Sequence, residues 1–434
     1  MSSRPSANRW ILFVLCAVAY FFSNFHRVSS AVIASDLQAQ FNASSSVLGV
    51  LSSTYFWAYA GLQLPIGIAT DRYSPRLIMT VGMALAAIGS LVFGLSSSLG
   101  VAVAARTLAG AGVAAVYIPS LKILGQAFGE AHFPTVTGFL IAAGNLGSLS
   151  ATSPFALLVG AIGWRWSFVV IAAVSAIMAG AAWHLMRGPW DDPRRQMASA
   201  QGAGDAKAAS GRGLGLFLAL GFAMFVKYGP LMGFQGLWGV PYLTQVYQMT
   251  KVQAGNLLMW ISIGYIVGGP FVGVLSDRFG LTLRSLLIGT SVLYLAAWGP
   301  LAFMTGTAAS ALLCATSLVM GITGSGSGVV AHALSTRSSG AGHEGGGLGI
   351  VNGFSLLGGA VFQPLMGFMI DRFTSAGLAQ VAAYARTFQM VFVVVIGMVL
   401  ISLFIPEPKA GSAVNGDNSS KRSSVTEEAK EIAL

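Results

Sequence analysis

The sequence predicts an all-α membrane protein with twelve transmembrane helices, arranged as two six-helix bundles related by pseudo-twofold symmetry. Of its 434 residues, 55% are hydrophobic and only 9% are charged, whereas about 25% of the residues of a soluble domain are charged. Apolar stretches of about 20 residues, the length that crosses a bilayer, recur along the whole chain. In addition, one loop motif occurs twice at widely separated positions.

Each predicted helix is a stretch in which apolar residues dominate, and a short polar turn separates it from the next in most cases. A soluble fold could not hide this much apolar surface. The start of the third helix shows the turn chemistry, because Ser74 suits its N-cap and Pro75 its first turn. We expect the twelve helices over residues 10–33, 46–68, 77–97, 100–123, 134–160, 166–187, 214–241, 253–275, 283–304, 308–332, 346–370 and 386–406.

Two longer segments, 186–213 and 408–434, are polar and poor in large apolar residues. This composition predicts a solvated linker and a disordered tail, because neither segment can bury enough apolar surface to fold. The expected organisation is an N-terminal six-helix bundle at 1–187, a cytoplasmic linker at 188–213, a C-terminal six-helix bundle at 214–406 and a cytoplasmic tail at 407–434.

Lysine and arginine predict the orientation in the membrane, because they are enriched on the cytoplasmic side. With the N-terminus inside, only Arg165, Lys251, Arg372 and Arg386 of the 24 basic residues fall in outer segments. We therefore expect a multi-pass protein of the cell membrane with both termini in the cytoplasm and no cleaved signal peptide. This topology also explains the net charge of +10, so the charge is no reason to invoke nucleic acid.

The loop motif points to an internal repeat. "GIATDRYSPRL" begins at Gly67 and "GVLSDRFGLTL" begins at Gly273, and both contain glycine, three residues, Asp-Arg and an aromatic residue. Each copy follows the second helix of its half. The two halves are therefore expected to be copies of one unit, and proteins built in this way bind their substrate near the bilayer midplane between the repeats.

These residues resemble the major facilitator superfamily of transporters over all twelve helices. "GIATDRYSPR" is similar to the family's loop between helices 2 and 3, departing from it at Ser74-Pro75, and "RTLAGAGVAA" at 106–115 is similar to its helix-4 motif. The resemblance implies alternating access, with Arg106 as a coupling or substrate residue and an inner gate in the loop motifs. A plain charged turn that sets the topology is the alternative for these loops. The expected gating residues are Gly67, Asp71, Arg72, Arg76, Gly273, Asp277 and Arg278.

Cations inside the helices are the strongest functional signal. Arg27, Arg106 and Lys227 lie within predicted helices, whereas all 14 acidic residues lie at helix ends, in loops or in the tails. An unpaired buried charge is costly, so a substrate anion is the simplest missing partner for Arg27 and Lys227. The alternatives are that Arg27 reaches the membrane surface and that Arg106 pairs with Asp36. His26 is a candidate for substrate binding or proton coupling, or else a packing residue.

The family branch that carries organophosphates and organic acids resembles this pattern, because it has basic residues in helices 1 and 7. The match departs from strict repeat symmetry, since the offset between the loop motifs pairs Arg27 with Gly233 and Lys227 with Phe21. Drug–proton antiporters of the family carry a Gly-Pro-rich motif in helix 5. In this sequence only scattered glycines and Ser153-Pro154 correspond to it, which disfavours a drug efflux pump. Polar and aromatic residues that could complete a substrate site are Tyr20, Asn24, Tyr55, Tyr59, Tyr117, Asn145, Tyr228, Gln235, Trp260 and Asn352.

Together these features predict a secondary active transporter of a small organic anion, either phosphorylated or carboxylated, that works as a monomer without a cofactor or a metal. A proton-coupled carrier of a neutral or zwitterionic solute, such as a drug, a sugar or a siderophore, is the alternative within the class. A membrane sensor with a transporter fold is the alternative outside it. No catalytic residues are expected, because the sequence offers no nucleophile–base pair and no metal-binding motif.

Overall fold

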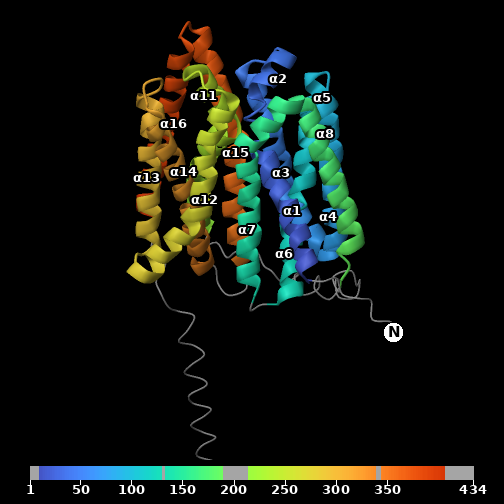
Figure 1. Ribbon diagram of the computed structural model, residues 1–434. Coiled ribbons are helices and arrows are strands. Elements are labelled where there is room, and N and C mark those ends of the chain that lie inside the picture. The colour runs from blue at the N-terminus through green and yellow to red at the C-terminus, as the bar shows by residue number, and fades with distance from the viewer. Residues whose placement is uncertain (1–8, 130–131, 189–213, 339–343, 406–434) are drawn as a thin grey trace, which may run out of the picture.

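The computed structural model describes residues 9–129, 132–188, 214–338 and 344–405, and within these ranges the chain is a bundle of long helices (Figure 1). The helices form two groups. The first group, the N-terminal half, contains α1 to α8, and the second, the C-terminal half, contains α10 to α16.

The N-terminal half begins with α1, whose helix stops at Val28 and is followed by turns before the short α2. Side-chain caps mark several helix starts, as when Ser44 accepts a hydrogen bond from the backbone of Val47 at the start of α3. The helices are α1 (Arg9–Val28), α2 (Ala34–Phe41), α3 (Ser45–Arg72), α4 (Pro75–Leu95), α5 (Leu99–Ala114), α6 (Tyr117–Phe128), α7 (Phe133–Ser150) and α8 (Ser153–Leu185).

The C-terminal half begins with α10, which passes into a π-helical turn, η2, before α11. The turn follows Pro230, which cannot donate a backbone hydrogen bond within the helix. Thr250 and Gln253 form a capping box at the start of α12. The elements are α10 (Leu214–Gly233), η2 (Phe234–Trp238), α11 (Gly239–Val246), α12 (Lys251–Phe279), α13 (Leu283–Phe303), α14 (Ser310–Ser338), α15 (Glu344–Ser375) and α16 (Gln380–Phe404).

Within the described residues these elements make the twelve expected crossings. Ten stretches are long and apolar enough to cross a membrane, and one of them, α8, turns back on itself at Gly163, where φ is +77°. The crossings are completed by α3 and by α7, which continues into the first residues of α8. The predicted helix over 386–406 was placed six residues late, because α16 begins at Gln380. Arg386 therefore lies in the second turn of α16.

The two halves repeat the same helix pairing. In the N-terminal half α1 packs on α7, α3 on α5 and α4 on α8, and in the C-terminal half α10 packs on α15, α12 on α14 and α13 on α16. Small residues allow these contacts, as is usual between membrane helices. A Cβ atom added to Gly112 of α5 would lie 2.4 Å from the backbone nitrogen of Ala86 in α4. The pairing matches the pseudo-twofold arrangement that the repeated motif predicted.

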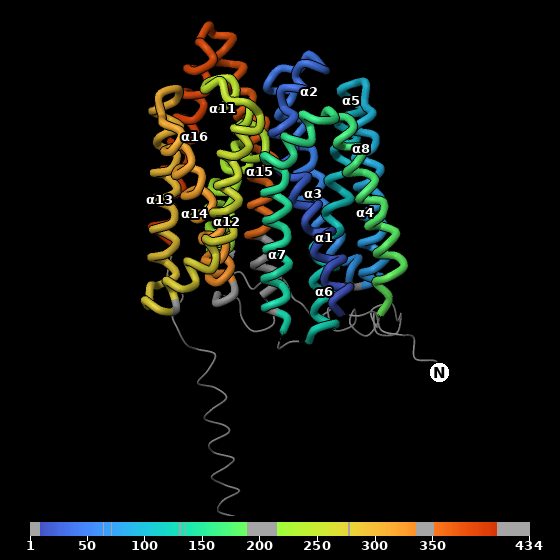
Figure 2. Tube along the Cα trace, viewed as in Figure 1, coloured from blue at the N-terminus to red at the C-terminus, as the bar shows by residue number. Residues whose placement is uncertain are grey.

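Three helix pairs join the halves. α3 packs against α15, and α12 packs against α7 and α8; Figures 1 and 2 show α7 beside α12. α2, α11 and the starts of α3 and α12 lie at one end of the molecule, which we call the α2 end (Figure 1). The loops that carry the repeated motif lie at the opposite end.

Candidate functional site

Arg27 lies in the last turn of α1, next to the point at which the helix ends at Val28. Its guanidinium donates a 2.9 Å hydrogen bond from Nη1 to the hydroxyl of Tyr228 in α10. It also lies over the ring of Tyr59, 5.8 Å from the ring centre. Its Nε atom is buried and has no hydrogen-bond partner among the described residues. Arg27 thus faces the other half of the protein, and its Nε–H group remains available to donate a hydrogen bond.

A small pocket surrounds this guanidinium between the two halves. The cavity within it has a volume of about 30 Å³, and most of the residues that line it are polar. The amide of Gln235 donates to the hydroxyl of Ser262 across the C-terminal side of the pocket, over 3.0 Å. The lining residues are Asn24, Arg27, Asn145 and Ser148 from the N-terminal half and Tyr228, Met232, Gln235, Ser262 and Tyr265 from the C-terminal half.

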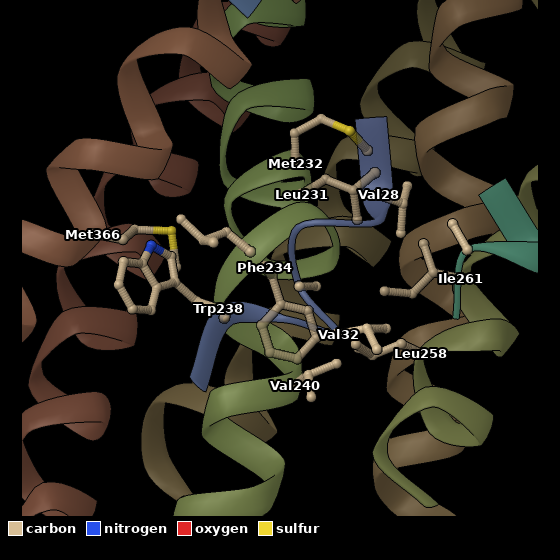
Figure 3. Close-up of a cluster of buried hydrophobic side chains, with 14 of the residues drawn as sticks. Val28, Val32, Leu231, Met232, Phe234, Trp238, Val240, Leu258, Ile261 and Met366 are labelled. Carbon is tan, nitrogen blue, oxygen red and sulfur yellow. The ribbon is translucent and has the colours of Figure 1, made fainter. Parts of the chain in front are cut away.

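An apolar cluster borders the pocket on the side of α2. Val28, the last residue of α1, and Val32, in the turns that follow, lie among Leu231, Phe234 and Ile261 of the C-terminal half, as Figure 3 shows. All of these side chains are buried. Because Val28 follows Arg27 directly and the cluster leads on towards α2, it separates the pocket from the α2 end.

Polar contacts also close the α2 end, and the sequence analysis missed them. The ammonium of Lys251 on α12 pairs with the carboxylate of Asp36 on α2 over 2.5 Å. Asp371 on α15 accepts hydrogen bonds from the backbone nitrogens of Ser45 and Ser46, at 2.9 and 2.6 Å, and from the Ser46 hydroxyl. A carboxylate at a helix N-terminus is favourable. In the sequence, the start of α3 is only a run of serines, which gives no sign of a carboxylate partner.

Lys227 does not share the pocket with Arg27, contrary to the expectation of one cavity for both. Its side chain is buried within the C-terminal half, and its ammonium nitrogen donates to the hydroxyl of Ser327 on α14. The side chain also lies over the ring of Tyr294. Neighbouring positions on a helix point in different directions, so when Tyr228 faces Arg27, Lys227 faces α13 and α14.

Arg106 and His26 lie behind Arg27, inside the N-terminal half. Arg106 donates to the backbone carbonyl of His26 over 3.3 Å and to the hydroxyl of Ser30 over 2.7 Å. Its guanidinium lies over the rings of Tyr55 and Phe93, at 5.2 and 5.7 Å. Basic groups are favourable at helix C-termini, so the end of α1 accounts for this buried cation.

The alternative pairing of Arg106 with Asp36 is wrong, because Asp36 pairs with Lys251. His26 is fully buried and its Nε2 atom lies 3.4 Å from the hydroxyl of Ser90, whereas its Nδ1 atom has no partner among the described residues. Its side chain therefore points into the N-terminal half and away from the pocket lining.

The remaining candidates divide between the pocket and its surroundings. Tyr59 lies against Arg27, and the hydroxyl of Tyr55 donates to the carbonyl of Ser23 over 2.8 Å. Tyr20 and Tyr117 stack on one another with ring centres 5.1 Å apart. Trp260 lines a separate open groove of about 450 Å³ beside Gln253 and Ser310. Asn352 is exposed on α15 and does not line the pocket.

The expected gating residues lie at the end opposite α2. The side chains of Asp71 and Asp277 fall outside the described side chains, so no contact of either is described. Arg76 lies over the ring of Trp183, 4.6 Å from its centre, and donates to the Trp183 carbonyl. Arg72 and Arg278 are exposed at the ends of α3 and α12, where Gly67 and Gly273 are also found.

Comparison with known proteins finds a family model that matches the chain twice. The model of the Major Facilitator Superfamily matches residues 13–237 and again residues 216–433. A probable sulfoacetate transporter of Cupriavidus necator is 24% identical over 320 residues, which cover 70% of this chain and 73% of that protein. A D-galactonate transporter of Escherichia coli is 20% identical over 41% of each chain. A chloroplastic ascorbate transporter of Arabidopsis thaliana is 21% identical over 43% of this chain and 35% of that protein.

Solved structures share the fold. The crystal structure of a bacterial homologue of the human lysosomal transporter Spinster, inward-facing and occupied, superposes with a TM-score of 0.70 at 19% identity, covering 93% of this chain and 97% of that one. The nucleoside transporter NupG superposes with a TM-score of 0.73 at 12% identity, covering 91% and 99%. At these identities the likeness establishes the twelve-helix architecture and nothing about the substrate.

Proposed function

Because the chain belongs to the Major Facilitator Superfamily, whose members are transporters and not enzymes, we propose that it carries a small organic anion across the cell membrane by alternating access. The observation that carries the proposal is Arg27. Its guanidinium lies in a polar pocket between the two halves, and no carboxylate is among the residues that line it. A planar guanidinium offers two-point hydrogen bonding to a carboxylate, sulfonate or phosphate.

The names of the relatives support an organic acid as the substrate. Sulfoacetate, galactonate and ascorbate are all small organic acids. The neutral groups of the pocket also suit the chemistry of such a ligand, because Asn24, Asn145 and Gln235 offer amides and Ser148 a hydroxyl for the hydroxyl or acid oxygens of a sugar acid. A neutral drug or sugar would leave the Arg27 guanidinium without its counter-charge, and this disfavours the alternative carrier.

The contacts at the α2 end define one state of the transport cycle. If the positive-inside rule holds for this chain, both termini are cytoplasmic and the α2 end faces outwards. The Lys251–Asp36 pair, the Asp371 contacts and the apolar cluster then close the pocket to the outside. The substrate would be exchanged on the cytoplasmic side in this state. A single chain contains the whole pocket, so a monomer suffices for transport.

A thermal-shift screen of the purified protein tests the proposal. A ligand that binds only the folded state raises the unfolding temperature by mass action. We expect sulfoacetate, D-galactonate, ascorbate or a sugar phosphate to stabilise the protein, and neutral sugars and hydrophobic cations to leave it unchanged. The stabilisation should vanish in Arg27→Gln and persist in Arg386→Gln, which removes a guanidinium that contacts Gln389 on α16 outside the pocket. Equal stabilisation of both variants, or stabilisation by neutral solutes alone, overturns the anion assignment.

A further inference from the structure

Lys227 is a buried cation that the proposed substrate site does not use. Its side chain is 1% exposed, and it lies in the interior of the C-terminal half. The two carboxylates whose side chains the structure describes, Asp36 and Asp371, both lie at the α2 end. A buried ammonium without a counter-charge is costly, and proteins retain such groups in membranes for a functional reason.

The surroundings of Lys227 are hydroxyl groups and an aromatic ring. The ammonium nitrogen donates to Ser327 of α14, and the Ser327 hydroxyl lies 2.7 Å from the hydroxyl of Thr290 on α13. Tyr294, also on α13, is the titratable group that faces Lys227: its ring lies under the amine, and its hydroxyl donates to the Lys227 carbonyl over 2.7 Å. Hydroxyls donate and accept hydrogen bonds, so this environment can accommodate a lysine with or without its extra proton.

The buried cations Arg106 and Lys227 differ in their surroundings and in how readily they lose a proton. Arg106 donates to the His26 carbonyl at the end of α1 and lies over two aromatic faces, while its Nε and Nη1 atoms have no partner among the described residues. Arginine also keeps its proton in proteins, whereas lysine exchanges its proton readily when buried. Lys227 is therefore the cation suited to take part in proton exchange.

The position of Lys227 connects it to the substrate pocket. Its neighbour in the chain, Tyr228, holds the guanidinium of Arg27 at 2.9 Å. Pro230 and the π-helical turn Phe234–Trp238 interrupt the same helix directly afterwards, and interruptions of this kind often occur where membrane helices move. An anion that took the place of the Tyr228 hydroxyl at Arg27 would act on the same helix that carries Lys227.

We propose that Lys227 carries a coupling proton and that the anion is transported together with it. In each cycle the amine nitrogen accepts one proton from water to become an ammonium and later returns it to water, and no other bond is made or broken. A bound anion adds a negative charge to the same weakly screened interior, which favours the ammonium form. Linkage then requires that the proton favour the anion in return. The proposal rests on the proposed function, because it needs an anion in the Arg27 pocket.

Proteoliposomes separate this proposal from the one it rests on. Two assays are run with D-galactonate and with sulfoacetate: counterflow, in which labelled substrate exchanges without a net driving force, and accumulation driven by a pH gradient with the acidic side outside. A pH dye inside the vesicles reports proton entry during uptake. For the unmodified protein we expect counterflow, accumulation and proton entry together.

The variant Lys227→Met keeps the length and the apolar character of the side chain and removes the proton site. We expect it to retain counterflow and to lose both accumulation and proton entry, so that the internal substrate reaches only the external concentration. Thr290→Val should weaken the pH-driven accumulation, because it removes the hydroxyl partner of Ser327. The matched control, Thr323→Val, removes a buried hydroxyl that bonds within its own helix, α14, and should leave accumulation unchanged.

The outcomes are distinct. Accumulation and proton entry that persist in Lys227→Met overturn the role of Lys227, and so does uptake by the unmodified protein without proton entry. Loss of counterflow in Lys227→Met, with the variant still monodisperse and stabilised by the ligand, also overturns it, because a pure coupling residue is not needed for exchange. Absence of counterflow in the unmodified protein overturns the proposed function itself, and the inference falls with it.

Discussion

The carboxylate of Asp371 accepts a 2.6 Å hydrogen bond from the backbone nitrogen of Ser46, a residue 325 positions earlier in the chain. Asp371 belongs to the last turns of α15 and Ser46 to the first turn of α3, so the contact joins the two halves. The first backbone nitrogens of a helix have no partner within the helix, and a carboxylate from the opposite half satisfies two of them here, at Ser45 and Ser46. Such a contact exists only while the α2 end is closed.

Replacing Asp371 should therefore favour opening at the α2 end. Hydrogen bonds to a charged group contribute about 1.5–3 kcal/mol, so Asp371→Asn should raise the rate of labelling from the α2 side by about tenfold or more. The measurement uses a membrane-impermeant maleimide and a cysteine at Met232, which lines the pocket, in a Cys314→Ala background.

The matched control is Asp36→Asn, which breaks the ion pair with Lys251 at the same end. Both side chains of that pair are about one-third exposed, at 29% and 32%, and exposed ion pairs contribute little. A smaller acceleration is expected than for Asp371→Asn. If neither variant labels faster than the parent, these contacts do not hold the α2 end closed.

Arg27→Lys should weaken anion binding although the charge is kept. Lysine cannot reproduce the two-point contact of a guanidinium, and one lost charge-assisted hydrogen bond, about 1.5–3 kcal/mol, corresponds to an affinity lower by about tenfold to a hundredfold. Isothermal titration of the purified variant with the ligand found in the thermal-shift screen measures this. Unchanged affinity in Arg27→Lys would mean that the guanidinium does not hold the anion.

Arg106→Gln should lower both the unfolding temperature and the anion affinity. The guanidinium of Arg106 holds the His26 carbonyl and the Ser30 hydroxyl on either side of Arg27, so its loss frees the end of α1 that positions Arg27. Arg106→Lys should restore part of the stability through the charge it keeps.

The control for Arg106 is Arg165→Gln. Arg165 donates to the carbonyls of Gly94 and Ser96 at the end of α4, a similar cap that lies away from the pocket. This variant should unfold at a lower temperature and bind the anion normally. Normal anion affinity in folded Arg106→Gln would show that Arg106 acts on stability alone.

Cysteine labelling in intact cells tests the topology. The distribution of lysine and arginine predicts that the loops at Ser98 and Gly306 lie outside the cell and that the linker and tail lie inside. Cysteines at Ser98 and Gly306 should react with an impermeant reagent, and cysteines at Ser210 and Ser419 should not. Reaction at Ser210 from outside would refute the cytoplasmic position of both termini.

The membrane class, the twelve crossings and the twofold repeat could all be predicted from the amino-acid sequence. Length and apolar content suffice for this, because backbone groups in hydrocarbon must be satisfied within a helix. It also singled out Arg27, since a cation within an apolar helix is conspicuous whatever surrounds it. The loop motif at Gly67 and Gly273 pointed to two copies of one unit, and the helix pairings of the two halves match.

Which polar groups contact one another depends on how the helices pack and could not be predicted from the sequence. The sequence predicted that Arg27 and Lys227 belong to one site. The direction of a side chain, however, depends on how its helix is rotated about its axis. Here the contacts with α13 and α14 direct Lys227 away from the pocket. The partners of Arg106 and Asp371 are equally invisible in the sequence, because they include backbone groups at helix ends, 80 and 325 residues away. Any residue type provides such groups, so only the packing of the helices determines where these charges are stabilised.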